Sequence, residues 1–220
     1  MGMSSIVKLL LIIWLVIASL TLPALAEDWF PNPNAGRLFF APTGKTPAKN
    51  QNHIYVSDLV FYNGRISFDN GFSCGGGIFP VLASVFYVAP QMRLFENDNF
   101  AWAVGGLLIG SGRWGKLGAA GLYTVTTFSY KNLSLTGGVG YLDPVSSLSP
   151  FQVVGGELRI LEWLSLVSEN WLTVTQFRMP ISINGVRFFG ENFSCELGGI
   201  PEKLATTNQI LPCINFVYNF

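Results

Sequence analysis

The chain has 220 residues, of which 50% are hydrophobic and 12% charged, and its formal net charge is zero. This composition is compatible with one domain, and the positive mean hydropathy is unusual for a soluble protein. The basic residues are scattered and balanced by acidic ones, which excludes nucleic acid as a partner. We therefore expect part of the surface to face something other than water.

The first predicted element is a secretory signal peptide in residues 1–26. An apolar run from Leu9 to Leu22 follows the basic Lys8 and precedes a small-x-small sequence that ends at Ala26. This layout predicts export and cleavage after Ala26, with residues 27–220 as the mature domain. An uncleaved anchor is the alternative, but the run falls short of the roughly 20 residues that a spanning helix needs.

The rest of the chain has no apolar window long enough for a membrane-spanning helix. A bilayer core offers no water to backbone groups, so only helices and closed barrels can cross it. The remaining way to cross a membrane is therefore a closed sheet.

Alternating strands are the main signal in this mature part of the chain. Five stretches have one apolar parity and one small or polar parity, as a lipid-facing strand requires. They lie at residues 84–95, 99–111, 133–142, 151–161 and 208–220. In the second stretch, Trp102 and Val104 alternate with alanines, which predicts bulky side chains outside and small ones inside.

Turn signals of two kinds alternate along the chain. Five tight, mostly polar turns are centred at Asn70, Asn97, Lys131, Glu162 and Glu191. Mostly longer connections separate them, at residues 43–52, 80–83, 111–116, 143–150, 175–179 and 199–207. Outer-membrane barrels have short periplasmic turns and longer extracellular loops, so we expect the tight turns and both termini on the periplasmic side.

These turns and longer connections predict twelve strands, an even number as in bacterial single-chain barrels. They are expected at residues 36–42, 53–66, 72–79, 84–95, 99–111, 117–129, 133–142, 151–161, 164–174, 180–189, 193–198 and 208–220. Merging or dropping short strands would give ten.

The end of the chain has aromatic or aliphatic residues at alternate positions: Ile214, Phe216, Tyr218 and the terminal Phe220. This pattern resembles the C-terminal signature by which the barrel-assembly machinery recognises outer-membrane β-barrel proteins of Gram-negative bacteria. The resemblance implies an all-β, antiparallel up-and-down transmembrane barrel in contact with outer-membrane lipid. A soluble, lipocalin-like periplasmic barrel is the alternative, and its apolar faces would point inward.

Charged residues on the parity opposite to the apolar one are candidates to line the lumen, because charge facing mid-bilayer costs roughly 2 to 4 kcal/mol. They are Arg93, Glu157, Arg159, Glu169, Arg187 and Glu196. They could form a polar constriction or a solute-binding wall, but we favour ion pairs that fill a narrow barrel. Because Arg187 shares its parity with Ile181 and Ile183, we expect a bulge at Asn184-Gly185.

Three cysteines in an oxidising compartment leave at least one unpaired. Cys195 and Cys213 flank the last predicted loop almost symmetrically, but their parities place them on opposite faces of the sheet. A disulfide between them is therefore disfavoured, and Cys74 is expected to be free.

The leading function hypothesis is a narrow outer-membrane pore for an unknown small solute, or a structural or surface barrel. The alternatives are the soluble binding barrel and a lipid-acting hydrolase that uses His53, which we expect near Ser57 at the extracellular start of a strand. No motif brings a nucleophile and a base together, and none indicates a metal or cofactor. We therefore predict no cofactor and no catalytic residues.

Overall fold

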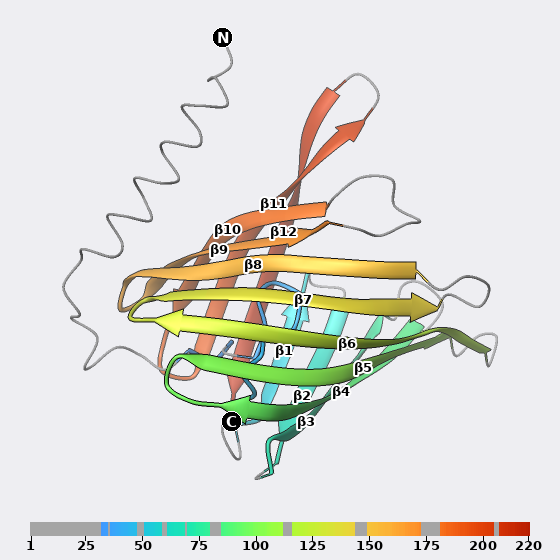
Figure 1. The fold of residues 1–220 in the computed structure, drawn as a ribbon. Helices are drawn as coiled ribbons and strands as arrows, with labels where there is room; N and C mark the ends of the chain where they lie inside the picture. Colours follow the sequence, from blue (N-terminus) through green and yellow to red (C-terminus); the bar gives the residue numbers. More distant parts are fainter. Residues whose placement is uncertain are drawn as a thin grey trace.

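The computed structural model describes residues 32–34, 36–47, 51–58, 61–68, 70–79, 85–111, 116–143, 149–172, 181–204 and 207–220 (Figure 1). The predicted signal peptide lies outside these residues. Twelve strands close into an antiparallel barrel in which each pairs with its neighbours along the chain and the first pairs with the last. The predicted fold class and strand number are confirmed. No helix among the described residues is long and apolar enough to span a membrane.

The strands follow one another as a meander. Their bounds are β1 His53–Ser57, β2 Phe61–Ser67, β3 Phe72–Phe79, β4 Val85–Glu96, β5 Phe100–Ser111, β6 Lys116–Tyr130, β7 Leu133–Asp143, β8 Ser149–Leu161, β9 Leu164–Trp171, β10 Ile181–Phe189, β11 Phe193–Leu204 and β12 Thr207–Asn219.

The barrel has two distinct ends. The five tight turns lie at the same end as the C-terminus, where the Phe220 amide donates to the Asn52 carbonyl and the Asn219 amide to Asn192. We call this the turn end and the opposite end the loop end. At the loop end, the β11–β12 hairpin projects beyond its neighbours (Figure 1), because the pairing of β10 with β11 stops at Gly199.

The outer wall is apolar. Leu122 and Ile54 are 74% and 53% exposed, while Val125 and Ser57, which point inward from the same two strands, are buried. The C-terminal residues follow the same alternation, since Phe216, Tyr218 and Phe220 are exposed. The soluble alternative is therefore wrong, because it requires the apolar face to point inward.

The prediction of a first strand at residues 36–42 is wrong. These residues lie inside the barrel. Of the expected extracellular loop at 43–52, Thr43 and Thr46 are buried and Asn52 lies at the turn end, where its carbonyl accepts from the Phe220 amide. The number of strands is preserved because the long second strand divides into β1 and β2 at Asp58, which has a φ of 51°. Asp tolerates this left-handed conformation better than most residues, so a tight turn fits there.

The expected bulge at Asn184-Gly185 is also absent, since β10 pairs with β9 and β11 without a register shift. Ile183 points inward onto an apolar patch and is buried there together with Leu38 and Phe39. The outward parity of β10 carries Ser182 and Asn184, which hydrogen-bond to each other at 3.0 Å. The rule that apolar side chains face lipid fails here because the lumen offers apolar contacts.

The seam between β1 and β12 is short. It has five residue pairs, from His53 with Asn219 to Ser57 with Asn215. Asp58 extends it: its amide donates to the Ile214 carbonyl at 2.6 Å, and its Oδ1 accepts from the Ile214 amide at 2.7 Å. The Asp58 side chain thus replaces a missing backbone acceptor.

We predict that Asp58→Ala weakens closure by about 1 kcal/mol, because the Ile214 amide loses its acceptor. The mature protein in mild detergent should migrate faster on gels before boiling than after, and the variant should lose this fast band at a lower temperature. Asp98→Ala, in an exposed turn at the other end, is the control. Equal conversion temperatures would contradict the role assigned to Asp58.

Candidate functional site

A segment of the chain lies within the barrel and forms its candidate functional site (Figure 1). We call residues 32–47, described except for 35, the inner segment. It folds into a small hairpin: the Leu38 amide donates to the Ala41 carbonyl at 2.9 Å, and the Thr43 amide donates to Gly36 at 3.1 Å. Arg37 and Pro42 form an isolated bridge between the two arms.

The tip of the inner segment packs against glycines of the wall. The side chains of Leu38 and Phe39 are almost completely buried. A Cβ atom at Gly155 would lie 2.4 Å from Leu38 Cδ1, and one at Gly198 would lie 2.9 Å from the Phe39 ring. Glycine at these inward positions of β8 and β11 makes room for the two apolar side chains.

A buried ionic cluster binds the same segment to the wall. Arg187 has no exposed side-chain surface and lies 2.5 Å from Glu157 and 2.8 Å from Glu196. It also donates to the Leu38 carbonyl at 2.9 Å, and Arg37 lies 3.4 Å from Glu196. Because buried charges are costly unless they are paired and hydrogen-bonded, this cluster depends on all its members.

Glu169 binds the backbone of the hairpin tip. Its Oε2 accepts hydrogen bonds from the Phe40 and Ala41 amides at 2.9 and 3.0 Å, and its Oε1 accepts from Trp171 at 2.7 Å. These backbone amides have no strand partner inside the lumen, so the carboxylate supplies the acceptor that burial demands.

The other arm of the inner segment contacts the opposite wall. Gln91 on β4 donates to the Thr43 carbonyl at 2.8 Å, and the Gly44 amide donates to Thr127 on β6 at 2.8 Å. A Cβ atom at Gly44 would lie 2.3 Å from the Ala101 carbonyl oxygen, so only glycine permits this close approach. The inner segment thus reaches across the lumen.

Four of the six predicted lumen residues, Glu157, Glu169, Arg187 and Glu196, meet around the inner segment. The other two lie toward the turn end. Arg93 pairs with Glu96, and Arg159 donates to the Glu162 carbonyl while its guanidinium lies 4.4 Å from the Phe189 ring centroid. The described part of the chain has no group of three His, Cys, Asp or Glu side chains arranged to hold a metal ion.

The placement expected for His53 is wrong. It lies at the turn end of β1, faces the lumen and contacts Asn219 Oδ1 at 2.6 Å, while Ser57 is buried at the other end of the strand. This arrangement offers no Ser-His pair on the outer wall to act on lipid. Cys74, Cys195 and Cys213 are all free.

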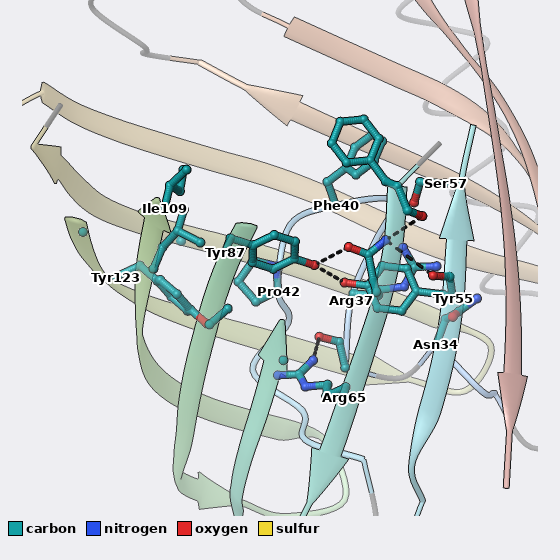
Figure 2. A pocket seen from close by; sticks show the side chains of 18 of the residues that line it. Asn34, Arg37, Phe40, Pro42, Tyr55, Ser57, Arg65, Tyr87, Ile109 and Tyr123 are labelled. Carbon is teal, nitrogen blue, oxygen red and sulfur yellow. Dashed lines mark hydrogen bonds between the residues drawn. The ribbon is translucent and has the colours of Figure 1, made fainter. Parts of the chain in front are cut away.

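A cavity of about 410 Å³ lies beside the inner segment and extends from Ile109 near the loop end to His53 at the turn end of β1. Arg37, Arg65, Tyr55 and Tyr87 line it together with apolar side chains, among them Phe40 and Ile109 (Figure 2). The Tyr55 and Tyr87 hydroxyls are 2.6 Å apart, and the Tyr87 hydroxyl donates to Asn63 at 2.8 Å.

Sequence reasoning missed the residues that contact the inner segment from β2 and β4. Arg65 and Gln91 are the main examples, with the Arg65 Nη2 donating to Gln91 Oε1 at 2.6 Å. Alternation with outward Ile66 could have placed Arg65 inside. The contribution of Arg37 was hidden because its segment was interpreted as a strand.

No protein-family model and no curated protein matches the sequence. Among solved structures, a KdgM porin is similar over 77% of this chain and 98% of its own, with 13% identity and a TM-score of 0.57. A KdgM porin in complex with disordered oligogalacturonate has the same coverage and TM-score, with 12% identity. A mutant of Rh. blastica porin covers 91% of this chain and 68% of its own, with 12% identity and a TM-score of 0.42. The KdgM likeness is one of fold.

We predict that Arg187→Met destabilises the barrel by about 3 to 5 kcal/mol, because it leaves buried carboxylates without their cation. The matched control is Arg93→Met, which breaks a partly exposed pair and should cost at most about 1 kcal/mol. Urea unfolding in detergent measures both. A small effect for Arg187→Met would show that the buried cluster contributes little to stability.

Proposed function

We propose that the chain is a narrow pore for small solutes in the outer membrane of a Gram-negative cell, exported by a signal peptide that is cleaved after Ala26. The observation that carries this proposal is a closed barrel with an apolar outer wall, a polar inner wall and a solute-sized cavity. Pockets of about 300 to 1,000 Å³ are typical of small-molecule sites. The barrel fold shared with KdgM porins also supports it.

In this proposal the turn end is periplasmic and the loop end extracellular, as in other outer-membrane barrels. The exposed Phe216, Tyr218 and Phe220 are available as the signal for the barrel-assembly machinery. The β11–β12 hairpin would then be an extracellular element.

The inner segment would be the constriction of the pore. It lies beside the cavity and makes polar contacts with both sides of the lumen, through Glu169 and Glu196 on one side and Thr127 on the other. The charged residues of β8 to β11 then act mainly as ion pairs that fill the lumen and hold the segment. A solute would pass either when the hairpin moves or along a narrow path beside the hairpin.

We predict that deletion of residues 32–47 from the mature protein raises single-channel conductance in planar bilayers several-fold, because the lumen loses its filling. The intact chain should give small or infrequent currents. Unchanged conductance after deletion would show that the inner segment does not obstruct the lumen, and silence of both proteins would contradict the pore.

Glu169→Ala provides a second test that keeps the inner segment. The Phe40 and Ala41 amides lose their shared acceptor, so the hairpin tip should detach more often and increase current fluctuations. Glu162→Ala, which changes an exposed carboxylate in a tight turn, is the matched control. Equal current noise in the two variants would count against a gating role for the tip.

A further inference from the structure

The cavity has an uneven lining. Its loop-end part is formed mainly by apolar side chains from several strands, including Val85, Leu107, Ile109, Leu142 and Phe151, together with the polar Ser57 and Asn63. Its deeper part holds guanidinium groups and tyrosine hydroxyls. Figure 2 shows Ile109 and Phe40 toward the loop end and Arg65 toward the turn end, with Tyr87 between them.

The charges in the lining are of one sign. Among the described residues that line the cavity, the charged side chains are Arg37 and Arg65, whereas Glu157, Glu169 and Glu196 do not line it. Arg37 stacks over the Tyr55 ring at 4.4 Å and shares Glu196 with Arg187. The deeper part of the cavity is therefore positive, and these three carboxylates lie outside its lining.

Arg65 has only neutral acceptors among the described residues. It donates to Ser73 at 3.2 Å, to the Gly36 carbonyl at 3.0 Å and to Gln91 at 2.6 Å. A guanidinium has five N–H donors, so two remain for a ligand. These bonds fix the half-buried side chain in place without neutralising its charge.

We propose that the cavity binds a small carboxylic acid with an apolar body, its carboxylate on Arg65 and its body against the apolar side chains near the loop end. Guanidinium and carboxylate form strong, directional hydrogen bonds, and the low-dielectric surroundings strengthen them further. A sugar acid would leave its hydroxyls unpaired against Leu107 and Ile109, which carries a desolvation penalty. This inference names the class of solute for the proposed pore. It rests on the proposed function only where the bound acid is taken to be that solute.

The test is equilibrium binding of 3-phenylpropionate to the mature protein in detergent, followed by tryptophan fluorescence, with Trp171→Phe to identify the reporter in the cavity wall. We expect saturable binding of 3-phenylpropionate. The neutral 3-phenylpropanamide and the polar galacturonate should bind at least tenfold more weakly. Tighter binding of galacturonate, or equal binding of the amide, would overturn the proposal.

Substitutions at two positions test the two parts of the site. Arg65→Met should weaken binding about 10- to 100-fold, because a charge-assisted hydrogen bond is lost, and Arg65→Lys should restore part of the affinity. Ile109→Asn should weaken binding of the phenyl body independently of the charge. The matched control Arg93→Met removes an arginine at the turn end and should leave binding unchanged.

The outcome is independent of conductance. Binding of the aromatic acid by a protein that is silent in bilayers would support the site and contradict the pore. A conducting protein that does not bind the acid would contradict the site and leave the pore standing. Equal affinity of wild type and Arg65→Met would also overturn the proposal.

Discussion

Closure of the sheet is the constraint on which the rest of the structure depends. Hydrocarbon offers no partner to a backbone amide, so the wall must satisfy all its amides through strand pairing. The chain achieves this by pairing β1 with β12, although β1 has only five residues. Asp58 continues the hydrogen bonding where β1 ends. Once the sheet is closed, alternate side chains are forced either outward to lipid or inward to a narrow lumen.

The inward side chains explain why the lumen contains a segment of the chain. A narrow barrel with small inward residues such as Gly155 and Gly198 would leave unfilled space, and Leu38 and Phe39 occupy it. The polar inward residues pair with the backbone of the same segment. The cavity lies beside this hairpin, so the space that the hairpin occupies determines how much of the lumen is free.

The fold could be predicted from sequence because lipid imposes a simple rule on outward residues and because tight turns recur at one end. Strand boundaries from β3 onward were mostly predicted to within a few residues, and β11 is the main exception because it continues to Leu204. The inner segment could not be predicted. Residues 36–42 form a short, partly apolar stretch like a strand, and two of their partners, Glu169 and Glu196, lie more than 120 positions away. Ile183 shows the same limit, since parity cannot reveal an apolar surface inside the barrel.

The inner segment also has a mechanical consequence for the seam. Gly36 and Arg37 connect Arg65 and Tyr55 on one side of the β1–β12 junction with Glu196 on the other. The segment therefore acts as an internal brace across a wall junction of only five residue pairs. A force or a solute that withdraws the hairpin removes this brace at the same moment. In the proposed pore, opening of the passage and resistance of the barrel to lateral rupture are thus coupled through one stretch of chain.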